Sequence, residues 1–434
     1  MTIRRLTLGV CATLIPSALL QAQTADTVRL SALQESALQR DPRMREMDLL
    51  AAQTRLRLRN LSAERLPSLS VAGQMQYQSD VARIPITLPG GATPPVPPHD
   101  TYDARIEAQQ RIIDPLARSR RALENAELAA SQARVRTSLY SLRQTVSDSF
   151  FAALYAQAQI GELGTTITDL EAQLGVASSR VREGSALPSE QNAIRAELLR
   201  RRQNRDELAA IRRASLSVLT SLIGESFDTA AVLELPDYSA STRAARDSIR
   251  TLRTRAEYEE FARSRDVLLR REETSGAEDK PSVSAFGRVG YGRPGLNPLN
   301  DRFDSYWLAG VQLRWTPWTW GSTGRDRQVL ALQRQIITAE ESAFTEGIQR
   351  AVAHDAESID RLEAALVTDD EIVALRERIA AETRARFTEG AVTAAEYVDR
   401  QTDVLSARIA RVLHRAELAQ AHARLLTTLG IGLR

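Results

Sequence analysis

PSLSVAGQMQYQ, residues 67–78, recurs as PSVSAFGRVGYG, residues 281–292. In both copies a glycine follows the proline by six positions and a tyrosine follows it by ten. Apolar side chains occupy every second position of the first copy, beginning with Leu69 and Val71, and small or polar residues lie between them. A period of two residues over this length predicts a β-strand with one apolar and one polar face.

The two copies belong to a longer internal repeat with a spacing of about 210 residues. RVREG at 180–184 recurs as RFTEG at 386–390, and an acidic residue lies six positions beyond each glycine. Prolines, glycines and aromatic residues carry the match, which argues against the chance self-similarity of a helix-rich chain. The expected units, in chain order, are a signal peptide at 1–22, a first repeat at 23–227, a linker at 228–240 and a second repeat at 241–434.

The strand alternation occurs in four segments, at about 67–79, 101–113, 281–292 and 304–316. In the second segment charged side chains alternate with other residues, which would be prohibitive in a dry core. Strands of about 9 to 11 residues with one apolar and one polar face are what a membrane barrel around water requires. Four strands cannot close such a barrel, and each unpaired edge amide in lipid costs several kcal/mol. Identical chains must therefore pool their strands.

All four tryptophans lie within fourteen residues around the last strand, at Trp307, Trp315, Trp318 and Trp320. An indole favours the membrane–water interface, so we expect these side chains to form an interfacial aromatic girdle against membrane lipid. The alternative is a local hydrophobic core beneath a soluble sheet. Glycine and proline at 90–98 and 293–298 predict loops at the barrel rim.

Long helices are predicted between the strand pairs and the repeat ends. Residues 117–182 contain no proline, and their apolar positions step by three and four. At about 1.5 Å per residue, such a helix approaches 100 Å. Each repeat is expected to form a helical hairpin that reverses at a tip, at about 183–188 in the first repeat and about 388–394 in the second.

The composition agrees with long helices, because only 5% of residues are aromatic and 26% are charged. The net charge of +2 does not indicate the basic surface that nucleic-acid binding requires. Residues 1–22 combine Arg4 and Arg5 with an apolar run and predict a secretory signal. No later segment approaches the roughly 18 to 20 apolar residues of a spanning helix.

No enzymatic site is expected. The only cysteine, Cys11, lies in the predicted signal, so disulfides and thiol chemistry are not expected in the mature chain. The four histidines lack metal-ligand spacing, and no phosphate loop, nucleophile elbow or dinucleotide fingerprint is present. We therefore expect no catalytic residue, no metal and no cofactor.

The order of strand pair, long helix, Arg-x-x-x-Gly break and second helix resembles the TolC family of outer-membrane factors over nearly the whole mature chain. The resemblance implies a mainly helical homotrimer with a 12-stranded β-barrel in the outer membrane of a Gram-negative-type bacterium, above a 12-helix periplasmic α-barrel. It implies a passive exit duct for an efflux pump or type I secretion system. A periplasmic adaptor would dock at the hairpin tips and link the duct to an inner-membrane pump. By position, the docking residues would be Gly184, Ser185, Ala186, Leu187, Gly390, Ala391, Val392 and Thr393.

The resemblance also places four residues at the periplasmic entrance: Glu190, Phe387, Glu396 and Asp399. Phe387 and Val392 replace the family's gate tyrosine and arginine, so we expect an apolar constriction there. Three copies each of Glu396 and Asp399 would attract cations. A soluble periplasmic coiled-coil adaptor and a structural helical protein without a pore are the alternatives. The sequence leaves the cargo open among drugs, metal ions, siderophores and polypeptides.

Overall fold

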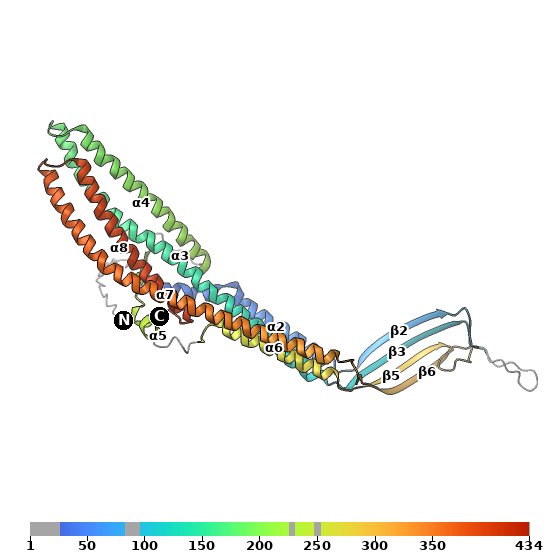
Figure 1. Cartoon of the computed structure of the whole chain (residues 1–434). Coiled ribbons are helices and arrows are strands. Elements are labelled where there is room, and N and C mark those ends of the chain that lie inside the picture. Colours follow the sequence, from blue (N-terminus) through green and yellow to red (C-terminus); the bar gives the residue numbers. More distant parts are fainter. Residues whose placement is uncertain (1–26, 83–95, 225–230, 247–252, 434) are drawn as a thin grey trace, which may run out of the picture.

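The computed structural model describes residues 27–82, 96–224, 231–246 and 253–433. The predicted signal peptide and most of the predicted loop at 90–98 lie outside these residues. The chain is mostly helical and elongated, with a β-sheet at one end and two helical hairpin tips at the other (Figure 1).

Each half of the chain runs through the same succession of elements. A helix leads into a strand pair, the second strand leads into a helix of 67 residues, and a helix of 36 residues returns from the tip. The first half contains α2 (Pro42–Ala63), β2 (Ser68–Tyr77), β3 (Asp100–Ile113), α3 (Leu116–Arg182) and α4 (Pro188–Ile223). The second half contains α6 (Ala256–Glu278), β5 (Ser282–Arg293), β6 (Asp304–Arg314), α7 (Ser322–Thr388) and α8 (Ala394–Leu429).

The four long strands form one antiparallel sheet in the order β2-β3-β5-β6. Its register places apolar residues of neighbouring strands opposite one another. Val71 lies opposite Ile106, which lies opposite Val289, which lies opposite Trp307. Because cross-strand partners share a face, most apolar positions of the four strands lie on one side of the sheet, with Phe286 and Leu308 on the other. β2 and β6 are its two open edges.

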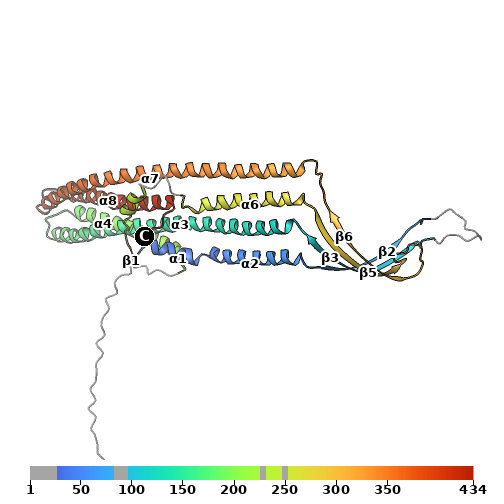
Figure 2. The same ribbon diagram turned by 90° about the horizontal axis from the view of Figure 1, so that it is seen from below.

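Four helices continue the sheet as a single layer, with α7 and α2 at the two edges and α6 and α3 between them (Figure 2). Farther from the sheet, α8 and α4 pair with α7 and α3 to form the two hairpins (Figure 1). Within the described ranges, no helix is both long and apolar enough to cross a membrane.

The main core lies midway along the molecule, where helices from both halves meet. Phe150 and Phe151 of α3 are fully buried there and pack at a ring-centroid distance of 5.4 Å, among leucines and alanines of α8. Two short helices, α1 (Leu30–Arg40) and α5 (Ser239–Arg246), also contribute side chains to this core. A second, smaller cluster lies at the hairpin tips.

Part of the segment predicted as a linker is folded. Strand β4 (Val232–Leu233) pairs in parallel with β1 (Thr27–Val28), and the Leu233 side chain is buried in the main core. Gln157 of α3 fixes this strand, because its side-chain amide exchanges two hydrogen bonds of 3.0 Å with the Leu233 backbone. The segment is therefore held against β1 and α3 of the first half.

Candidate channel and docking surfaces

The apolar face of the sheet is open to the surroundings of the chain. Val71 is 79% exposed, Trp307 74% and Val311 69%. Large apolar side chains are strongly exposed on all four strands, so no part of the described chain covers this face. A contiguous apolar surface of this kind marks contact with a partner or with lipid.

The opposite face carries charged side chains that neutralise one another within and between strands. Glu107 of β3 pairs with Arg288 of β5 at 3.1 Å, and Asp103 pairs with Arg105 at 2.6 Å. Asp103 also accepts a hydrogen bond from the Tyr306 hydroxyl. These side chains are partly accessible to solvent, as expected for a face that meets water rather than a dry core.

All four tryptophan side chains are more than half exposed. They therefore do not form a core beneath the sheet, and that alternative is wrong for this chain. Trp315 donates its indole N–H to the Asp279 carbonyl at 3.1 Å, and Trp318 and Trp320 meet edge to face at a centroid distance of 5.8 Å. Trp315, Trp318 and Trp320 lie where the sheet ends and α7 begins, whereas Trp307 lies within β6, opposite Val289.

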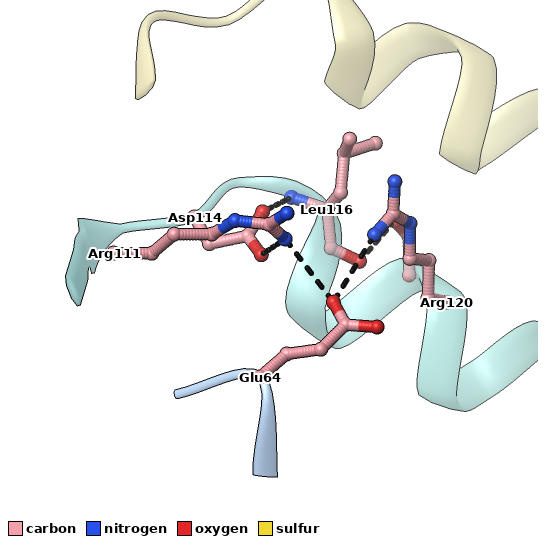
Figure 3. A network of polar contacts seen from close by, with 6 residues as sticks. Glu64, Arg111, Asp114, Leu116 and Arg120 are labelled. Carbon is pink, nitrogen blue, oxygen red and sulfur yellow. Dashed lines mark hydrogen bonds and ion pairs between the residues drawn. The ribbon is translucent and has the colours of Figure 1, made fainter. Parts of the chain in front are cut away.

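A polar network holds the junction between the sheet and the helices (Figure 3). Glu64, which follows α2, accepts from Arg111 at 3.1 Å and from Arg120 at 3.4 Å. Asp114 accepts from the backbone N–H of Leu116 at 2.9 Å and so satisfies a free amide at the start of α3. The end of α2, the end of β3 and the first turn of α3 are thus joined.

The candidate docking residues lie together at the far end of the molecule, in two reversals with the same backbone geometry (Figure 1). Gly184 and Gly390 adopt φ values of 73° and 77°. In each turn the next N–H closes the helix end, from Ser185 to the Arg180 carbonyl and from Ala391 to the Arg386 carbonyl. Glycine is favoured because a residue with a Cβ atom adopts this left-handed conformation only with strain.

The helices that leave the two reversals begin differently. Pro188 occupies the first turn of α4, where its missing N–H costs nothing. Thr393 caps α8 by accepting from the Glu396 N–H at 3.3 Å. Leu187 is an exposed apolar side chain beside the first reversal.

Phe387 requires a correction. We expected it to form an apolar constriction, but its side chain is only 3% exposed within the single chain. It stacks on Tyr397 of α8 at a centroid distance of 5.0 Å, among apolar side chains of α3 and α4. Val392 packs against the same cluster. Apolar contact between the two hairpins therefore draws Phe387 inward.

Polar groups complete this tip cluster and join the two hairpins. Tyr397 donates its hydroxyl to Asp169 of α3, and Arg384 of α7 pairs with the same carboxylate at 3.0 Å. Arg180 of α3 donates to the Phe387 carbonyl at 3.1 Å and to the Thr388 carbonyl, at the end of α7. Burial, together with the Asp169 hydrogen bond, raises the pKa of Tyr397 well above its ordinary value. Tyr397 therefore stays a neutral donor.

Sequence reasoning missed the roles of Asp169, Arg384 and Tyr397, and it quoted Arg180 only as part of a repeated motif. The predicted acidic entrance residues lie near the same tips. Glu396 and Asp399 are exposed on α8, and Glu190 is partly exposed on α4. In the described part of the chain, no group of three or more His, Asp or Glu side chains is placed to hold a metal ion.

The chain has the fold of outer-membrane channel proteins. CusC matches with a TM-score of 0.69 and 15% identity, over 93% of this chain and 92% of that chain. VceC of Vibrio cholerae matches with a TM-score of 0.66 and 16% identity, over 93% and 97%. The open state of Neisseria gonorrhoeae MtrE matches with a TM-score of 0.63 and 19% identity, over 94% and 90%.

No family model and no curated protein sequence matches the chain. At these levels of identity the structural matches show the fold. The mainly helical fold implied by the resemblance to TolC-like outer-membrane factors is therefore confirmed.

Proposed function

We propose that this chain is one subunit of a homotrimeric exit duct in the outer membrane, whose twelve pooled strands form a barrel above a periplasmic helical tunnel. The observation that supports this most is the four-strand apolar face, uncovered and in register, between two open sheet edges. In lipid, an open sheet must be closed by further strands. The fold of known outer-membrane channels supports the same assignment.

The edges of the helical layer support head-to-tail assembly. Leu49 and Leu56 of α2 are exposed at one edge, and Val329 and Leu332 of α7 are exposed at the other. These stripes continue the open edges of β2 and β6. A contact between two different edges is heterologous, and it forms a ring when the rotation closes.

Cross-linking tests this assembly. Leu56 and Val329 each lie seven residues from the end of their helix nearest the sheet, so they lie at matching heights. The double variant Leu56→Cys with Val329→Cys, treated with a short bismaleimide, should give dimer and trimer bands and no larger species. Each single variant serves as a control and should remain monomeric on a denaturing gel. A ladder beyond three, or no cross-linking, would contradict the trimer.

The tips are the proposed docking surface for a periplasmic adaptor, which links the duct to an inner-membrane pump. Gly390→Pro should abolish co-purification of the cross-linked adaptor from native membranes, because proline cannot adopt the φ of 77° found there. The trimer should remain intact. Gly347→Ala, inside α7 with open space around it, is the matched control. Unchanged adaptor recovery from the Gly390 variant would refute docking at this tip.

The exposed acids near the tips are proposed to attract cations at the periplasmic entrance. Replacing Glu396 and Asp399 with alanine removes six negative charges from the trimer and should shift the reversal potential in a KCl gradient toward zero. Glu346→Ala, an exposed acid far from the tips, should leave it unchanged. The same reversal potential in both variants would show that the entrance acids have no role in selectivity.

A further inference from the structure

A groove of about 700 Å³ lies on one face of the four-helix layer near the sheet. All four helices, α2, α3, α6 and α7, contribute side chains to it. Its large apolar lining residues are Leu50, Leu128, Val267, Leu268, Ile336 and Ile337. A cavity of this size matches the range of about 300 to 1,000 Å³ found for small-molecule sites.

The charged side chains around the groove are paired. Arg57 of α2 pairs with Glu124 of α3 at 3.4 Å, and Arg271 of α6 pairs with Glu127 of α3 at 2.9 Å. Arg134 at the border pairs with Glu260 at 3.5 Å. These pairs leave little net charge for a free ion. The groove thus combines an apolar floor with a polar border, which suits a neutral or amphipathic solute rather than an ion.

The groove and the polar face of the sheet lie on the same side of the layer. Along α3, residues 120, 124, 127, 131 and 134 step by four and three, so they share one helix face. Arg120 lies at the end of this row nearest the sheet, where it lines a hollow beside Ser68, Gln109 and Ser284 of the polar sheet face. The other four residues of the row line the groove. In the proposed duct, this side is the lumen.

We propose that the groove binds neutral or amphipathic small molecules with a substantial apolar body as they pass through the duct. This inference rests on the proposed function for the position of the groove in a lumen. A second copy of the chain is not the occupant, because the stripes on α2 and α7 direct neighbouring copies to the edges of the layer. The groove would act as a transient binding site for apolar cargo in the helical part of the duct, next to the barrel.

The test uses the full trimer in phosphatidylcholine nanodiscs with the neutral fluorophore N-phenyl-1-naphthylamine. Leu128→Gln combined with Val267→Gln changes only the two central helices, away from the edges. It should weaken saturable binding at least tenfold. Ser131→Trp, which fills the groove without removing an apolar side chain, should do the same. Ala129 lies on the opposite face of α3. The control variant Ala129→Gln is measured in the same nanodiscs, so probe uptake by lipid is equal, and its Kd should equal that of the unaltered trimer.

Single-channel conductance separates this inference from the proposed function. Conductance retained by the double variant, together with weakened binding, supports the groove. Equal Kd values in the groove variants and the Ala129 control would overturn the groove and leave the duct standing. An unaltered chain that never conducts would overturn the duct itself.

Discussion

Val71→Arg should prevent stable insertion of the barrel. Val71 lies near the middle of β2, in the apolar row with Ile106, Val289 and Trp307, and nothing in the described chain covers it. An arginine facing lipid at the bilayer midplane costs about 2 to 4 kcal/mol per copy. Because the trimer carries three copies, we expect most of the chain to be lost from the carbonate-resistant outer-membrane fraction.

Ser70→Arg is the matched control for this prediction. Ser70 is the adjacent residue on the polar face, opposite Glu107, so an arginine there meets water and a carboxylate. Insertion should be nearly unchanged. Folding titrations in urea with lipid vesicles measure the difference between the two variants. If both insert equally well, the apolar face does not contact hydrocarbon, and the proposed barrel is wrong.

The sheet could be anticipated because its information is local. The alternation from Leu69 to Tyr77 assigns each side chain to a face before any partner strand is known. The helix reversals could also be predicted from the sequence, since the glycines at 184 and 390 follow the same Arg-x-x-x pattern in both repeats. The observed helix ends at Arg182 and Thr388 adjoin these glycines.

The tip cluster could not be anticipated, because its partners come from hairpins more than 200 residues apart. The family pattern assigns Phe387 to one tip, and it contains no information about contacts with the neighbouring hairpin. Its burial depends on how closely α3 and α4 approach α7 and α8. Pairing of β1 with β4 was hidden for another reason, since two residues per strand are too few to show a period.

Tyr397→Ala should loosen both tips while leaving the rest of the chain folded. The Tyr397 ring is fully buried against Phe387, and its hydroxyl contacts Asp169. Removing a buried aromatic side chain costs about 3 to 5 kcal/mol. The main core shares no buried residue with the tip cluster, so the loss should stay local. Amide hydrogen exchange should accelerate at the ends of α3 and α7 and remain slow around Phe150.

Tyr397→Phe separates the ring from its hydroxyl. Phenylalanine keeps the stacking on Phe387, and Arg384 still pairs with Asp169, so the loss should be only about 1 kcal/mol for the missing hydrogen bond. A large effect from both variants would mean that the Asp169 hydrogen bond, rather than ring packing, holds the hairpins together. Unaltered exchange at the tips in the alanine variant would mean that the hairpins do not depend on this cluster. Phe387 and Tyr397 both belong to the second hairpin, so the contacts of Arg384 with Asp169 and of Arg180 with the Phe387 carbonyl would then hold the two tips together.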